Sequence, residues 1–132
     1  MHGSGDERAP IALLRASALD LPFPPNSFDY CITSLFLHHL KDIEVLTVLR
    51  MMDRLATRGI VWNDLTRNRR AYWMTSFATI FADPIVKHDA RVSILAGFTG
   101  REVLDMRDRL SLDYTQYRRH FYHRFTLAGE KF

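Results

Sequence analysis

Residues Ala18–Leu40 read ALDLPFPPNSFDYCITSLFLHHL, and this stretch decides how the rest of the chain is interpreted. Its first part, Asp20–Ser27, contains three prolines, so it cannot form a helix, and Pro-Pro-Asn-Ser is a turn signal. Phe28–Leu35 follows with aromatic and β-branched residues and is apolar on both faces, which is typical of a strand in a covered parallel sheet. The stretch predicts a stiff loop, a strand, and a pair of histidines, His38 and His39, where the strand ends.

An amphipathic helix is predicted directly after this strand. Asp42 is a suitable N-cap, and Glu44 lies in the first turn, where the helix dipole favours an anion. Gly59 is expected just beyond the end of the helix, and Ile60–Leu65 reads as a second strand. A strand, a helix and a strand with short connections form a βαβ unit with parallel strands. The apolar positions of the helix recur every three or four residues: Val45, Val48, Leu49, Met52, Leu55 and Ala56.

Two further helices are expected in the second half of the chain. Arg70–Phe81 places its aromatic residues on one face and ends before Asp83-Pro84, because the residue before a proline avoids the helical region. Thr99 and Glu102 form a capping box, in which each side chain accepts a hydrogen bond from a free amide, and this predicts that a helix begins there.

The two ends of the chain carry shorter signals. Ile11–Leu14 is an apolar run consistent with a buried strand, although a run of this length does not distinguish a strand from a helix. Ser111–Tyr117 and His120–Leu127 are predicted strands, and a turn at Arg118-Arg119 would join them into an antiparallel hairpin. We therefore expect a flexible start over residues 1–10 and a single domain over residues 11–132.

Composition narrows the function classes. The 132 residues are 47% hydrophobic and 25% charged, with a formal net charge of +3, as in an ordinary globular domain. Basic clusters lack any nucleic-acid motif and read as solvated surface, so no nucleic-acid partner is expected. No apolar run has the length of a membrane span. A single cysteine, Cys31, excludes an intramolecular disulfide and reads as a small buried hydrophobe, which favours the cytoplasm.

Three segments of this chain resemble the middle of a class I S-adenosylmethionine-dependent methyltransferase: Ser17–Pro24, Asn26–Asp29 and Leu35–Leu40. The nearest subgroup is that of quinone and small-molecule methyltransferases. The strand at Gly59–Leu65 and the helix opened by Phe98-Thr99 are also similar to that family. The resemblance covers most of the chain and implies an α/β fold: an incomplete Rossmann-like methyltransferase sheet with a βαβ unit and a C-terminal antiparallel hairpin.

The resemblance also implies S-adenosylmethionine as cofactor, with about half of its pocket present. Ser17 stands where the family usually has an acid that meets the adenine amino group, so only a neutral hydrogen bond is expected there. Ala18 and Leu19 match the neighbouring adenine contact, which Ala18 makes through its backbone. Ser34 and Leu35 match the region beside the methionine part of the cofactor, at the carboxyl end of a strand.

The glycine-rich turn of the family has no counterpart in this sequence. Only Gly3-Ser4-Gly5 precedes the first apolar run, and it follows no strand. In the family the strand order is 3-2-1-4-5-7-6, so the missing strands would have separated Ile11–Leu14 from Phe28–Leu35. The strand at residues 28–35 then becomes an edge, and exposed apolar edges pair with other chains. We expect a homo-oligomer formed through this edge.

Five residues are candidates for acting on a substrate or contacting it. His39 resembles a position at the mouth of the active site, where it would orient a substrate hydroxyl or act as a general base; capping the following turn is an equal alternative. His38, Arg70, Trp73 and Phe77 are the candidates for substrate contact, against the plainer readings of core aromatics and solvated charge. Adjacent side chains on extended backbone point to opposite faces, and no metal-ligand spacing accompanies the two histidines, so no metal is expected.

The function that follows is methyl transfer to a small, apolar or aromatic acceptor. Because the glycine-rich cofactor motif is absent, little or no activity is expected from the chain by itself. Two alternatives stay open: a non-catalytic ligand-binding or oligomerisation module, and a fragment of a longer methyltransferase.

Overall fold

The computed structural model describes residues 10–67, 97–121 and 123–132, together with Trp73, Ser76, Phe77, Ile80 and Asp83–Ile85. Within these residues the chain is a mixed α/β protein. Its elements are β1 (Phe28–Ser34), η1 (Leu37–His39), α1 (Asp42–Leu55), β2 (Ala56–Leu65), α4 (Gly100–Arg109), β3 (Gln116–His120) and β4 (Arg124–Glu130).

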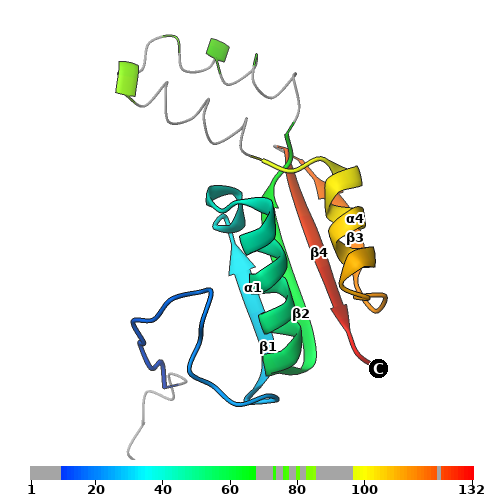
Figure 1. Cartoon of the computed structure of the whole chain (residues 1–132). Coiled ribbons are helices and arrows are strands. Elements are labelled where there is room, and N and C mark those ends of the chain that lie inside the picture. Colours follow the sequence, from blue (N-terminus) through cyan, green and yellow to red (C-terminus); the bar gives the residue numbers. More distant parts are fainter. Residues whose placement is uncertain are drawn as a thin grey trace, which may run out of the picture.

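One four-stranded sheet organises the described chain, in the order β1-β2-β4-β3 (Figure 1). β1 and β2 are parallel and connected by α1, whereas β4 is antiparallel to both β2 and β3. The predicted βαβ unit and C-terminal hairpin are confirmed. The order also corresponds to the last four positions of the family's sheet, and β1 lies at the edge, as expected.

Both helices lie against the same face of the sheet (Figure 1), and their inward residues share one core with the strands. All six apolar positions predicted for the first helix are buried, although Ala56 begins β2. Trp62 is at the centre of this core, with its ring centroid 4.9 Å from that of Phe98 and 5.0 Å from that of Phe125. The predicted capping box of α4 is present: Thr99 Oγ1 accepts from the amide of Glu102, whose carboxylate accepts from the amide of Thr99.

Gly59 has a different role from the one predicted. α1 ends at Leu55 and β2 begins at once at Ala56, so Gly59 lies inside the strand and does not end the helix. A Cβ at Gly59 would lie 2.1 Å from the carbonyl oxygen of Gly129 on β4, so the close approach of these two strands requires a glycine at position 59. The N-cap of α1 is Lys41, one residue before the predicted Asp42, and its amide donates to Glu44 Oε2 at 2.9 Å.

The hairpin turn also differs from the prediction. β3 and β4 pair from Gln116↔Ala128 to His120↔Arg124, which places Arg118 and Arg119 in a strand, and Phe121 and His123 lie in the turn beyond it. Ser111 has a φ of 53° and lies in the turn after α4, so the first strand starts later than predicted.

Ile11–Leu14 forms no strand in the structure, which corrects the prediction of a buried strand. The exposed fractions of Ile11, Leu13 and Leu14 are 86%, 95% and 60%. Among the residues that the structure describes, the sheet stops at β1, so no neighbouring strand covers this run.

Two predicted segments lie largely outside the described residues. Residues 1–9 fall there, as does most of the predicted helix Arg70–Phe81, of which Trp73, Ser76 and Phe77 are described and helical. None of the helices in the described ranges combines the length and apolar content that crossing a bilayer requires.

Candidate functional site

The carboxyl ends of β1 and β2 lie side by side because the two strands are parallel and in register, with Ser34 paired to Asn63. Asn63 Nδ2 donates to Ser34 Oγ at 3.3 Å, and the amide of Leu35 donates to the carbonyl of Asn63 at 2.9 Å. Leu35 has a φ of 52°, a conformation that costs a non-glycine residue about 1–2 kcal/mol. This strained residue turns the chain out of the strand into η1 and so places the two histidines over the strand ends.

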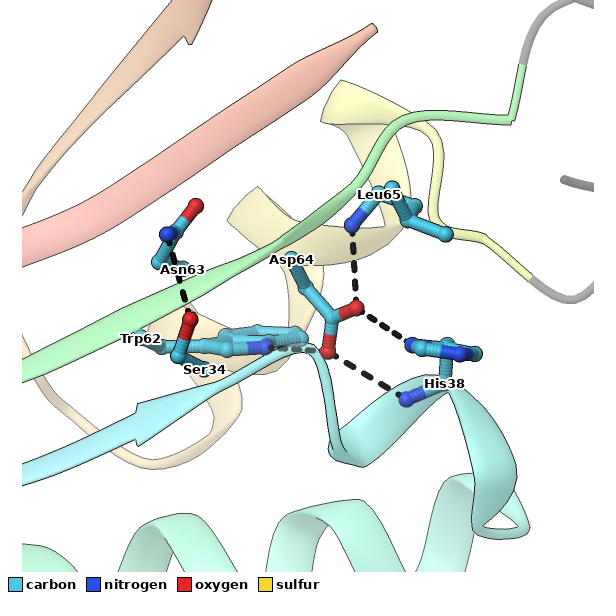
Figure 2. A network of polar contacts seen from close by, with 6 residues as sticks. All are labelled: Ser34, His38, Trp62, Asn63, Asp64 and Leu65. Carbon is cyan, nitrogen blue, oxygen red and sulfur yellow. Dashed lines mark hydrogen bonds and ion pairs between the residues drawn. The ribbon is translucent and has the colours of Figure 1, made fainter. Parts of the chain in front are cut away.

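His38 and Asp64 form a buried pair at this edge, and Figure 2 shows the surrounding network. His38 Nδ1 lies 2.6 Å from Asp64 Oδ1, and the side chains are 4% and 0% exposed. Three N–H groups also donate to the carboxylate: the amide of Leu65 at 2.9 Å, the indole of Trp62 at 3.2 Å and the amide of His38 at 3.3 Å. The network thus joins η1 to the end of β2.

These donors fix the roles of the two side chains. Both oxygens of Asp64 already accept an N–H that cannot act as an acceptor, so the carboxylate serves here as an acceptor only. His38 Nδ1 must therefore carry the proton and donate it, which leaves the lone pair of the neutral ring on Nε2. Within the described part of the chain, Nε2 has no hydrogen-bond partner. A histidine held in this way is chemically suited to accept a proton at Nε2.

His39 is exposed beside this pair, and the centroids of the two imidazole rings are 4.0 Å apart with a 41° angle between the planes. The argument from extended backbone was wrong, because His38 and His39 belong to the one-turn helix η1, which brings their rings together. The described residues contain no group of three or more His, Cys, Asp or Glu side chains suited to a metal.

The predicted adenine-side residues form a closed turn. Ser17 Oγ accepts from the amide of Leu19 at 3.2 Å, and the Ser17 carbonyl accepts from the amide of Asp20 at 3.2 Å. Ala18 is partly buried and lines a groove of about 360 Å³ together with Thr33 and Phe36. The structure therefore brings Ala18 to the groove along the flank of β1, and Ser34 and Leu35 are exposed at the carboxyl end of that strand.

The residues predicted to contact substrate are described less completely. Arg70 lies outside the described residues. Trp73 and Phe77 are 70% and 79% exposed and belong to a segment of which only single residues are described. Their proposed role as a lid stays a prediction.

The sequence reading missed Asp64 and Trp62. A signal for Asp64 was available: it is the acid near the carboxyl end of the second predicted strand, and parallel strands end at the same sheet edge. The histidines after the first strand had to lie near it. Trp62 had a weaker signal: residues two apart in a strand share a face, so it lies beside Asp64, but the bond between them also depends on the rotation of the indole.

Comparisons with known proteins are consistent with the methyltransferase resemblance seen in the sequence. Residues 2–61 match a family model described as a methyltransferase domain. An S-adenosylmethionine-dependent methyltransferase from Aquifex aeolicus superposes with a TM-score of 0.55 over 90% of this chain at 14% identity. The chain has a methyltransferase fold.

Two other methyltransferases superpose equally well. Magnesium protoporphyrin IX methyltransferase from Synechocystis PCC 6803, solved with bound S-adenosylhomocysteine, gives a TM-score of 0.56 over 89% of this chain at 12% identity. An O-methyltransferase family 2 protein from Planctomyces limnophilus in complex with apigenin gives 0.55 over 89% at 14% identity. This chain spans 54%, 49% and 33% of the lengths of the Aquifex, Synechocystis and Planctomyces proteins. No curated protein matches the chain in sequence.

Proposed function

We propose that this chain supplies part of an S-adenosylmethionine-dependent methyl-transfer site that acts on a small, apolar or aromatic acceptor. The observation that carries the proposal is the buried His38–Asp64 pair at the carboxyl ends of β1 and β2. In open α/β sheets, ligands bind outside the carboxyl ends of the parallel strands. In a methyltransferase fold this is where a proton acceptor for the methylated group is useful.

The two histidines receive different roles in this proposal. His38 Nε2 accepts the proton of the acceptor's hydroxyl or amine, and Asp64 stabilises the imidazolium that results. His39 is exposed beside it and orients the acceptor, as the sequence suggested, although only His38 has a carboxylate partner. Leu35 and Phe36 are 38% and 39% exposed at the same edge, which suits an apolar acceptor.

The described residues fit one side of the cofactor. Ala18 and Leu19 would contact the adenine through the turn that begins at Ser17, and Ser34 and Leu35 would lie beside the methionine part. S-Adenosylmethionine, when bound, supplies an activated methyl group. Because the chain spans at most about half the length of the similar structures described above, we propose that it has little activity by itself.

The test uses the chain with radiolabelled S-adenosylmethionine and a panel of simple phenols, in single-turnover reactions with protein in excess. We expect slow methyl incorporation that falls about 100-fold in His38→Gln, the effect typical of a lost general base. The His39→Gln variant should retain its rate within about ten-fold and lose affinity for the acceptor. Equal rates in His38→Gln and the wild type would overturn the assignment of His38. Cofactor binding with no transfer to any phenol would favour a non-catalytic ligand-binding module.

A further inference from the structure

β1 has a partner on one side only. It pairs with β2, and in the described residues no strand lies on its other side, so a row of its backbone N–H and C=O groups is unpaired. Each face of this edge carries an apolar residue: Ile32 is 71% exposed on one face, and Cys31 packs against the core on the other. A strand edge of this kind is a template for another strand.

An apolar groove runs along the same edge on the side of α1. Its volume is about 360 Å³, and no charged residue lines it. Leu21 and Phe23 line it, together with Met51, Met52 and Leu55 of α1. Because successive side chains of a strand point to opposite faces, an added strand would place every second side chain on the α1 side of β1, toward Met51, Met52 and Leu55.

Ile11–Leu14 has the properties that such a strand needs. It is apolar at every position, and Ile11 and Leu13, which share one side of an extended chain, are 86% and 95% exposed. The connection to its own groove is short and is closed into the Ser17–Asp20 turn, with Leu21 and Phe23 already in place beyond it. In one copy of the chain, Ile11, Leu13 and Leu14 are exposed and do not line this groove.

We propose that Ile11–Leu14 of one copy adds to the β1 edge of a second copy, with Ile11 and Leu13 seated in the partner's groove. A reciprocal exchange of the two segments gives a closed two-fold dimer. This exchange specifies how the homo-oligomer expected from the sequence would be built. The groove is the one that Ala18 lines, so it adjoins the cofactor side of the proposed site, but the pairing leaves His38 and Asp64 untouched and is tested without a methyl-transfer assay.

The first experiment measures molar mass by light scattering after size exclusion, over a range of concentrations. The wild type should be a dimer, and Ile11→Glu/Leu13→Glu should raise the dissociation constant by about 100-fold or more, since two aliphatic side chains lose their burial. The matched control is Ile43→Glu on the outer face of α1, where Ile43 is 69% exposed, and it should remain dimeric. His38→Gln should also remain dimeric. A monomeric wild type, or a dimer unaffected by the double substitution, would overturn the proposal.

The second experiment fixes the pairing, with Cys31, the only cysteine of the chain, as the reporter in the groove. Wild-type chains are mixed with Leu13→Cys/Cys31→Ser chains and oxidised, and the linked peptides are identified by mass spectrometry. A disulfide between positions 13 and 31 then joins two different chains, at twice 15.4 kDa. Ala12→Cys/Cys31→Ser is the matched control: its thiol faces the opposite side of the strand and should link far less.

Two outcomes would overturn this pairing. In the first, the mixture gives no 13–31 disulfide, whereas the single variant Leu13→Cys, which keeps Cys31, forms one within a single chain; the segment then folds onto its own groove. In the second, oxidised wild type links Cys31 to Cys31, which means that two β1 edges meet directly.

Discussion

Asp64→Asn is expected to lower the free energy of unfolding by about 2–4 kcal/mol, although the substitution changes one atom of a buried side chain. Asp64 Oδ1 accepts from His38 Nδ1 at 2.6 Å and from the Leu65 amide at 2.9 Å. Oδ2 accepts from Trp62 Nε1 at 3.2 Å and from the His38 amide at 3.3 Å. Asparagine offers one acceptor oxygen and one NH₂ group in place of these two oxygens.

Neither orientation of the asparagine amide satisfies all four donors. If the oxygen takes the place of Oδ1, the NH₂ group faces the indole of Trp62 and the amide of His38, and both donors lose their acceptor. If it takes the place of Oδ2, the amide of Leu65 loses its acceptor and His38 must move its proton to Nε2. Each buried donor left without a partner costs about 1–3 kcal/mol. The second orientation leaves fewer donors unpaired and is the one expected. One unpaired donor, together with the loss of the charged acceptor, gives the range of about 2–4 kcal/mol.

The assay is equilibrium unfolding in urea, followed by tryptophan fluorescence. Asp29→Asn is the matched control: it makes the same chemical change at an exposed position, where the carboxylate accepts a long hydrogen bond of 3.5 Å from Thr57 Oγ1. It should change stability by less than about 0.5 kcal/mol. If Asp64→Asn unfolded at the same urea concentration as the wild type and as Asp29→Asn, the network would not stabilise the fold as described.

Three further predictions follow from single contacts. Burial, together with the hydrogen bond to Asp53, raises the pKa of Tyr114 well above its usual value. As the pH rises, the unfolded chain therefore loses the phenolic proton of Tyr114 before the folded chain does. The stabilising effect is therefore complete below about pH 10 and is lost as the pH rises further; Tyr114→Phe should flatten the alkaline fall in urea midpoint, and an unchanged slope would contradict this. Gly129→Ala should destabilise by about 1–3 kcal/mol in thermal melts, because its Cβ would lie 2.0 Å from the carbonyl oxygen of Tyr114. Gly100→Ala, whose Cβ meets only a side chain at 3.1 Å, should cost less, and the reverse order would refute the packing argument. Burial raises the pKa of Cys31, so its alkylation by iodoacetamide should be several-fold slower at pH 8 than in the unfolded chain and should still rise above pH 9; equal rates at pH 8 would show an open thiol.

The sheet could be predicted from the sequence because its signals are local. Three prolines before Phe28, the helical spacing from Val45 to Leu55, and the Thr99–Glu102 capping box each depend on neighbouring residues only. These signals, with the family's strand order, were enough for the βαβ unit, the hairpin and the edge position of β1.

The errors arose where a residue's role depends on a distant segment. Gly59 looked like a helix end, yet it is required by the backbone of Gly129 on another strand. Ile11–Leu14 looked buried, yet burial needs a partner strand that the described residues of this copy do not supply. Asp64 was passed over because its importance comes from His38, which is far away in the sequence.

The most direct test of the central claim is a titration of the ¹⁵N-labelled chain with S-adenosylhomocysteine, followed by amide chemical shifts. The claim is that the Ser17–Leu19 turn and the carboxyl ends of β1 and β2 form one side of a methyl-transfer site. The account predicts shifts concentrated at residues 17–19, at Ser34 and Leu35, and at His38. No shifts at millimolar ligand, or shifts confined to the β3–β4 hairpin, would contradict it.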